Sequence, residues 1–134
     1  TSPDPLFLCL IFGFFFLWEA GGQNIPNDYT DIEEDRQINA KTLPLIFGRN
    51  MASSLIIGLL AAALGVMTAL FFLSPIDFNW ISYLIFGAGS FFLLMLPAQK
   101  LKKTGKNQSA MALFNKASYY PFFLLGVVLM NLFL

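Results

Sequence analysis

Four long apolar runs alternate with polar segments along the chain. A helix needs roughly 20 mainly apolar residues to cross about 30 Å of hydrocarbon. Apolar runs extend over residues 6–20, 52–73, 78–96 and 117–134. The first is short and closes on Trp18 and Glu19, and the other three contain no charged residue. The third run is expected to stop at Pro97, and Gly58 and Gly65 in the second are expected to allow close helix packing. The pattern predicts an all-α, polytopic transmembrane helical bundle of about four spans, forming one domain over residues 1–134.

Composition agrees with a chain whose solvent is lipid. Hydrophobic residues make up 57% of the 134 and charged residues 12%, about half the charged share usual for a soluble domain. The formal net charge is zero and there is no His. These facts argue against a basic surface for nucleic acid, an imidazole zinc site and a Ser-His triad. We therefore expect a lipid bilayer as a partner and no nucleic acid.

The basic residues all fall on one side if the four runs cross the membrane in turn. They lie between the first two runs or between the last two: Arg36, Lys41, Arg49, Lys100, Lys102, Lys103, Lys106 and Lys116. By the positive-inside bias that side is cytoplasmic. The chain is thus predicted to be a multi-pass integral protein of the cell inner or plasma membrane. The alternative explanation is chance combined with the general polarity of loops.

The most polar segment, residues 21–44, separates the first two runs. If it forms a helix, Asp28, Asp31 and Asp35 stand at positions i, i+3 and i+7, and Asn24 stands one turn earlier. All four side chains then project from one stripe. Like charges one turn apart repel, so a cation is expected on that stripe.

The chemistry of the stripe favours magnesium and a diphosphate. Carboxylate and amide oxygens are the hard ligands that Mg²⁺ prefers, and substrate phosphates often complete its shell. Arg36 and Lys41 follow closely and are expected to neutralise phosphate oxygens that the metal does not bind. The alternative is a solvated acidic loop. The metal site is preferred because ionisable groups beside a membrane span are costly and usually functional.

The segment resembles the second aspartate-rich motif of the UbiA superfamily of intramembrane prenyltransferases. That motif reads N-D-x-x-D-x-x-x-D, followed by a K/R-T/S-x-P/A turn. The residues that fit it are Asn27, Asp28, Asp31, Asp35, Arg36, Lys41, Thr42 and Pro44. The run through Phe47 and Gly48 is similar to the family's next helix start, and residues 113–118 extend the resemblance toward the last run. Asn39 departs from the pattern, since the family commonly has Gly there.

The resemblance implies a fold of nine transmembrane helices with two aspartate-rich motifs, which together hold Mg²⁺ and the diphosphate of an isoprenyl donor. Only one such motif is present here, so the four runs resemble helices six to nine, the C-terminal half of a longer domain. The isolated piece is expected to be inactive.

The same resemblance implies roles for the residues of the motif. Asp28, Asp31 and Asp35 would be the catalytic Mg²⁺ ligands, Asn24 would support them and Lys41 would bind the diphosphate. The implied reaction ionises an allylic diphosphate, and an aromatic or other lipid or quinone-precursor acceptor captures the prenyl cation.

Other functions compete with this one. CDP-alcohol phosphotransferases also use a D-x-x-x-D pair, but their preceding D-G-x-x-A-R element is absent. A non-enzymatic transporter or subunit with an acidic cytoplasmic vestibule predicts polar residues along the spans, and few are present. Soluble prenyl synthases do not match the apolar composition.

Overall fold

The computed structural model describes residues 4–133, which contain helices and no strand. Two of the helical segments, η1 and η2, are π-helical. In chain order the elements are α1 (Pro5–Glu19), η1 (Ala20–Asn24), α2 (Ile25–Thr30), α3 (Ile32–Gln37), α4 (Leu43–Phe47), α5 (Arg49–Leu73), α6 (Trp80–Ser90), η2 (Phe91–Met95), α7 (Leu96–Thr104), α8 (Asn107–Ser118) and α9 (Tyr120–Phe133).

Four helical stretches are long and apolar enough to cross a membrane: Pro5–Thr30, Arg49–Leu73, Trp80–Thr104 and Asn107–Phe133. The predicted all-α bundle of four spans is therefore confirmed. The expected boundaries are wrong at several ends, because three of the helices continue well into polar sequence. These extensions carry part of the aspartate-rich segment and much of the basic charge.

Two of the prolines inside the long helical stretches, Pro26 and Pro97, follow π-helical turns. Pro97 comes two residues after η2 and does not end the third span, contrary to expectation. Pro26 stands in the same relation to η1. A proline in an α-helix lacks the N–H for the carbonyl four residues back, and its ring collides with that carbonyl. A π-helical turn changes the local hydrogen-bond register, so the helix continues past each proline.

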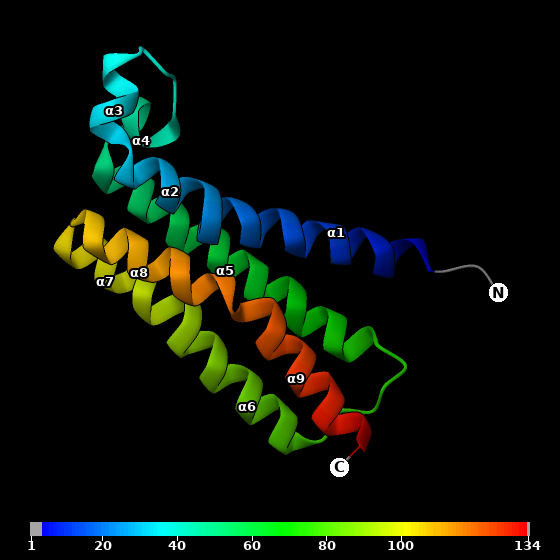
Figure 1. Cartoon of the computed structure of the whole chain (residues 1–134). Coiled ribbons are helices and arrows are strands. Elements are labelled where there is room, and N and C mark those ends of the chain that lie inside the picture. The colour runs from blue at the N-terminus through cyan, green and yellow to red at the C-terminus, as the bar shows by residue number, and fades with distance from the viewer. Residues whose placement is uncertain (1–3, 134) are drawn as a thin grey trace.

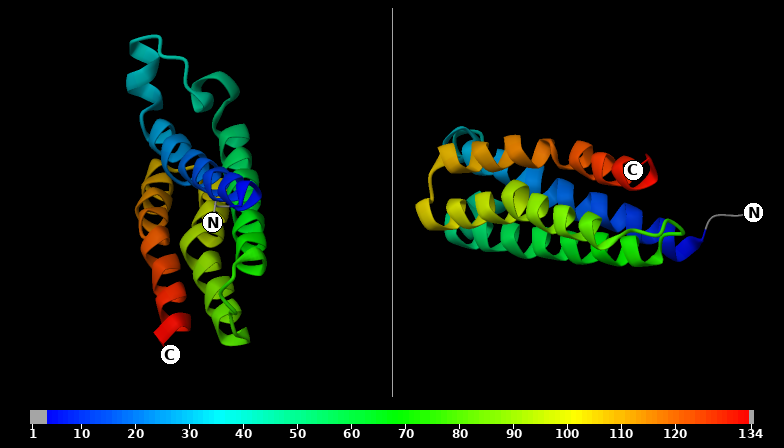
Figure 2. Two further views of the ribbon diagram at one scale, coloured as in Figure 1. Left: turned by 90° about the vertical axis from the view of Figure 1, so that its right-hand side faces the viewer. Right: turned by 90° about the horizontal axis from the view of Figure 1, so that it is seen from below.

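The four stretches pack side by side in a bundle (Figures 1 and 2). The helix α1 packs along α5, α6 along α9, and α7 along both α5 and α8, while α2 lies against α8. The α3–α4 segment and the α7–α8 turn lie at one end, whereas the start of α1, the end of α9 and the α5–α6 connection lie at the other (Figure 1). We call the first the motif end.

The first and fourth spans are joined by a hydrogen bond that depends on a proline. Pro121 has no N–H to donate to the carbonyl of Ala117, one turn earlier in the helix. The indole Nε1 of Trp18 donates to that oxygen instead, at 3.0 Å. Nearby, Gln23 Nε2 donates to the carbonyl oxygen of Phe114 at 3.1 Å. These bonds hold the base of the polar segment against α8.

Close backbone approach occurs where α1 passes into η1. A Cβ atom on Gly22 would lie 2.9 Å from the Cβ of Ala117, and one on Gly21 would lie 3.0 Å from the Cβ of Leu59. Gly58 and Gly65, which were expected to provide such contacts, have no atom of another element within 4 Å of a built Cβ. The tight crossing therefore lies at the start of the polar segment rather than within α5.

Much of the apolar surface is left uncovered. Only 17% to 33% of the residues in the most hydrophobic window of each span are buried within the chain. Large exposed side chains include Phe12, Phe16, Phe92 and Phe122. Such surfaces are stable in lipid or against further protein. The chain is an integral membrane protein.

Candidate functional site

The aspartate-rich segment begins as the continuation of the first span. Asp28 lies on α2 and Asp35 on α3, and Asp31 occupies the single residue between these helices, with φ −101° and ψ 13°. The amide of Asp31 donates to the carbonyl of Asp28 at 3.2 Å, and the amide of Asp35 donates to the carbonyl of Asp31 at 2.8 Å. The uninterrupted helix assumed from the sequence is thus wrong at Asp31, because the chain bends there.

One face of this broken helix is anchored in the bundle. Ile25, Tyr29 and Ile32 are 3%, 1% and 3% exposed, and their spacing of four and three residues places them on one helical side. The guanidinium of Arg49, at the start of α5, lies 5.2 Å from the centroid of the Tyr29 ring. Burial of this face leaves the polar residues of α2 and α3 on the outer side.

Two further contacts tie the motif end together. Arg49 donates to Asn107 Oδ1 at 3.1 Å, which links α5 to the start of α8. Lys102, on α7, donates to Asn50 Oδ1 at 3.1 Å and also contacts Ser54 Oγ, both on α5. Sequence reasoning missed these contacts because the residues that form them are far apart in the chain. The only signal was their shared position at the polar ends of the apolar runs.

The three carboxylates carry uncompensated charge. Asp28, Asp31 and Asp35 are each partly buried, and Asp28 lies within electrostatic range of the other two. Within residues 4–133, none of their carboxylate oxygens accepts a hydrogen bond or forms an ion pair. Like charges gathered in this way repel each other, so the segment favours a bound cation.

The three carboxylates lie on one segment but do not by themselves form a complete metal site. Among the described residues, no three carboxylate or thiol groups stand close enough together to hold a metal ion. The donor type nevertheless fits Mg²⁺, which takes hard oxygen ligands and commonly needs only one or two carboxylates beside phosphate oxygens and water. The residues therefore fit part of a Mg²⁺ site by donor type.

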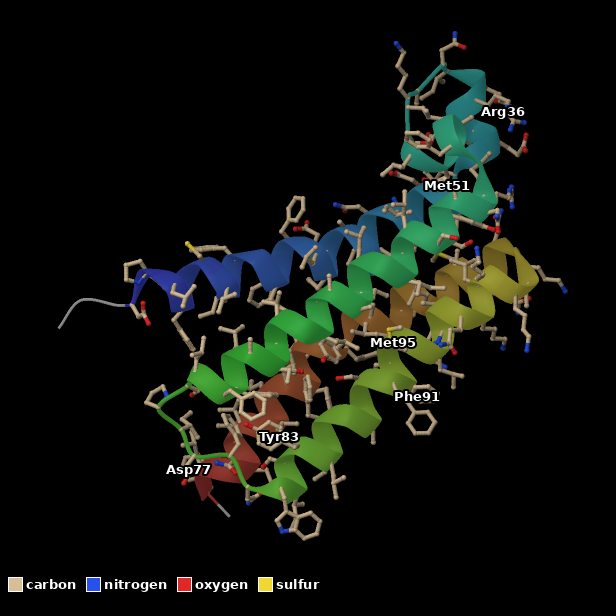
Figure 3. All side chains as sticks on the ribbon, turned by 180° about the vertical axis from the view of Figure 1, so that it is seen from behind. Arg36, Met51, Asp77, Tyr83, Phe91 and Met95 are labelled. Atoms are coloured by element: carbon tan, nitrogen blue, oxygen red, sulfur yellow. The ribbon has the colours of Figure 1, made fainter. Side chains whose placement is uncertain are left out.

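Asn24 and the basic residues expected to bind diphosphate are all exposed at this end. Asn24 is the last residue of η1, one turn before Asp28. Arg36 lies on α3 at the outer end of the molecule (Figure 3) and pairs with Glu33 at 3.4 Å. Both side chains of that pair are mostly exposed, so the pair contributes at most about 1 kcal/mol. Lys41 lies in the connection between α3 and α4 and has no ion-pair partner among residues 4–133.

The turn after the motif accommodates its unusual residue. Asn39 adopts φ 56°, in the left-handed region, which Asn tolerates better than other non-glycine residues. Its amide donates to the carbonyl of Arg36 at 3.3 Å, and the next amide, of Ala40, donates to Asp35 at 3.0 Å. Asn39 therefore adopts a positive φ, which Gly, the residue common at this position in the family that the segment resembles, adopts readily. Farther along, the buried hydroxyl oxygen of Thr42 lacks a partner in the described part of the chain.

The next helix starts as the resemblance led us to expect. Gly48 adopts φ 88° between α4 and α5, a conformation that L side chains rarely adopt. The turn brings Pro44, which is buried, back toward α2. The short helix α4 therefore packs beside the carboxylates rather than extending into solvent.

Similarity to known proteins is found at the level of a protein family. The sequence model of the UbiA prenyltransferase family matches residues 1–127. No curated protein and no solved structure matches the chain. The matched region takes in the first three spans, the whole aspartate-rich segment and most of the fourth span. A membrane bundle with this motif at the end of its first span, matched over nearly its full length, belongs to the UbiA prenyltransferase family.

Proposed function

We propose that this chain forms part of a Mg²⁺-dependent prenyltransferase that moves an isoprenyl group from an allylic diphosphate to an aromatic or other lipid or quinone-precursor acceptor. The family supports membrane prenyl transfer in general. The observation that carries the finer proposal is the group of three partly buried carboxylates on α2, on α3 and on the residue between them. No described residue forms an ion pair with any of the three.

Each residue of the segment has a distinct role in this proposal. Asp28, Asp31 and Asp35 hold Mg²⁺, which when bound stabilises the negative charge that develops on the leaving diphosphate. Asn24 supplies an amide oxygen one turn before them. These residues position the donor head at the membrane boundary, while its apolar tail extends toward the spans.

The two cations near the carboxylates complete the charge balance. Lys41 contacts diphosphate oxygens that the metal does not bind, and Arg36 exchanges its weak pairing with Glu33 for the stronger, charge-assisted bond to phosphate. Breaking the bond between the allylic carbon and the diphosphate oxygen leaves a prenyl cation and diphosphate. The acceptor then forms the new bond to carbon and releases a proton.

The location follows from the distribution of charge. Of the eight basic residues, three lie between spans, and the other five lie on the halves of the spans nearer the motif end: Arg49, Lys100, Lys102, Lys103 and Lys116. We propose that the motif end faces the cytoplasm. The four spans serve as helices six to nine of a nine-helix domain, and a second aspartate-rich motif supplies the remaining metal ligands. The single domain over residues 1–134 is then one half of the catalytic unit.

The first test is Mg²⁺-dependent binding of a labelled prenyl diphosphate to the longest native chain that contains this sequence. Asp31→Asn and Asp35→Asn remove a negative charge while keeping side-chain size, so each is expected to weaken binding by at least tenfold. Chelation of Mg²⁺ is expected to abolish the difference between the parent and these variants.

Glu34→Gln is the matched control. Glu34 is exposed on α3 and lies outside the set of expected ligands, so its variant is expected to bind like the parent. Unchanged binding in both aspartate variants would reduce the segment to a solvated acidic loop and would contradict the proposal. An equal loss in Glu34→Gln would point to general electrostatics instead of a metal site.

A further inference from the structure

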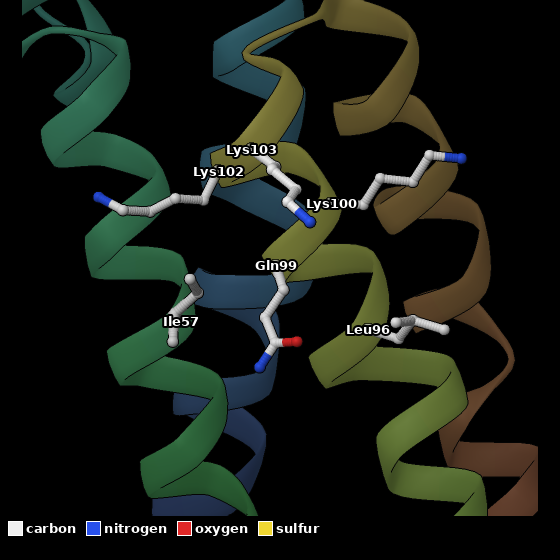
Figure 4. Close-up of a pocket in the computed structure, with 6 residues that line it drawn as sticks. All are labelled: Ile57, Leu96, Gln99, Lys100, Lys102 and Lys103. Carbon is white, nitrogen blue, oxygen red and sulfur yellow. The ribbon is translucent and has the colours of Figure 1, made fainter.

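A second site lies between α5 and the third span, away from the carboxylates. A cavity of about 620 Å³ opens there on the outer side of the bundle. It is lined by Ile57, Leu96, Gln99, Lys100, Lys102 and Lys103. Apolar side chains lie on the side toward the membrane interior, and the lysines lie nearer the motif end (Figure 4). The cavity therefore has an apolar groove, formed by Ile57 and Leu96, beside a cationic rim formed by the three lysines.

The charge of this rim is not balanced by neighbouring acids in sequence. Between residues 96 and 118, which form α7, α8 and their turn, there are five lysines and no Asp or Glu. The one ion pair found among residues 4–133 joins Arg36 to Glu33 on α3. Orientation of the spans requires basic residues at this boundary, but it does not require them to surround an apolar cavity.

The three lysines of the rim differ in what they contact. Lys102 reaches α5, where it donates to Asn50 and contacts Ser54. Lys100 extends to the opposite side, and Lys103 lies between them (Figure 4). Neither Lys100 nor Lys103 has a hydrogen-bond or ion-pair partner within residues 4–133. Two lysine ammonium groups thus remain available above the groove.

We propose that this cavity binds an anionic phospholipid of the bilayer. The phosphate of the headgroup contacts Lys100 and Lys103, and an acyl chain lies in the groove beside Ile57 and Leu96. Basic pockets between helices at the membrane boundary suit anionic headgroups. Lys102 serves a structural role, since its contacts hold α7 against α5 and keep the rim in place. The inference is independent of the prenyl transfer proposed above.

The test measures which lipids stay bound. The longest native chain containing this sequence is reconstituted in nanodiscs of mixed phosphatidylcholine and phosphatidylglycerol, then extracted, and its retained lipids are counted by mass spectrometry. The parent is expected to retain more phosphatidylglycerol than phosphatidylcholine, relative to their proportions in the nanodisc. Lys100→Gln together with Lys103→Gln is expected to reduce that preference roughly fivefold for each lysine removed.

Two matched variants make the result specific. Lys106→Gln with Lys116→Gln removes the same charge from the same hairpin outside the cavity, and it is expected to keep the preference. Lys100→Arg with Lys103→Arg keeps the charge and is also expected to keep it. The melting temperature of each variant shows that it is folded, and prenyl diphosphate binding by Lys100→Gln with Lys103→Gln is expected to equal that of the parent.

Several outcomes would overturn the proposal. Equal losses in the two glutamine pairs would mean that the lysines act only through total charge. Absence of any preference in the parent would mean that the groove does not select anionic lipid, as expected if another segment of a longer chain covers it. If Lys100→Gln with Lys103→Gln retained phosphatidylglycerol at the parent's level, Lys100 and Lys103 would not be the residues that bind the lipid.

Discussion

Asn39 shows how much a single residue decides at the motif end. It is the one non-glycine residue among those described that has a positive φ. Its turn connects α3, which carries Asp35, to the segment that carries Lys41. A change in the backbone there would move Lys41, which is expected to bind diphosphate, relative to the aspartates that are expected to bind Mg²⁺.

This position gives a direct test of backbone strain. Asn39→Ala places a Cβ-bearing residue without a compensating polar side chain in the left-handed region, at a cost of about 1 kcal/mol, whereas Asn39→Gly relieves that restriction. We expect amide hydrogen exchange in residues 36–42 to become about fivefold faster in Asn39→Ala and to stay near the parent's rate in Asn39→Gly. Identical rates in the two variants would show that the left-handed turn does not limit local stability.

At the same scale, sequence spacing predicted that the three aspartates share one segment, but it did not predict the bend within that segment. The positions of Asp28, Asp31 and Asp35 place them on one segment, as expected, but periodicity assumes a straight helix. The bend at Asp31 depends on backbone bonds and on burial of Tyr29 against the rest of the bundle. No local pattern encodes a contact with Arg49, which is 20 positions away in the chain.

At the scale of helices, the number of spans could be predicted and their ends could not. Apolar runs of membrane length identify a span because lipid requires continuous nonpolar side chains. The polar residues 97–104 and 107–116 are helical because α7 and α8 pack against each other. A local rule that ends helices at proline fails at Pro97, since η2 precedes it.

The close contact between Gly22 and α8 gives a prediction about packing. In Gly22→Ala, the added Cβ lies 2.9 Å from Ala117 Cβ, so the first span must move away from α8, at a cost of about 1–3 kcal/mol. We expect a lower melting temperature in detergent. Gly58→Ala is the control, because its added Cβ meets only open space, and its melting temperature is expected to be no lower than the parent's. A Gly22→Ala protein as stable as the control would show that this crossing adjusts freely.

At the scale of the whole molecule, charged residues and exposed apolar side chains occupy different parts of the bundle. The motif end gathers the carboxylates and the basic hairpin, and the opposite end is joined by hydrogen bonds of Asn131 to Asn79, Ser82 and Asp77. Large apolar side chains cover the outside of the spans. The bundle therefore concentrates its charged residues at the motif end, whereas side-chain hydrogen bonds hold the opposite end together.

The isolated piece gives a test at this scale. Residues 1–134 contain one aspartate-rich segment, and the described carboxylates do not by themselves assemble a metal site. We expect the purified 134-residue piece to show no prenyl transfer to an aromatic acceptor in the presence of Mg²⁺, while the longest native chain measured beside it turns over. Detectable product from the piece alone would show that a second motif is unnecessary.

The bend at Asp31 has a consequence for the timing of catalysis. Because α2 and α3 meet at a single non-helical residue, the angle between them can change while both helices stay intact. In the proposed site, metal and diphosphate would overcome the repulsion among the three carboxylates, so part of their binding free energy would be used to assemble the site. The same cost would lower the affinity for the diphosphate product, and we expect it to speed product release.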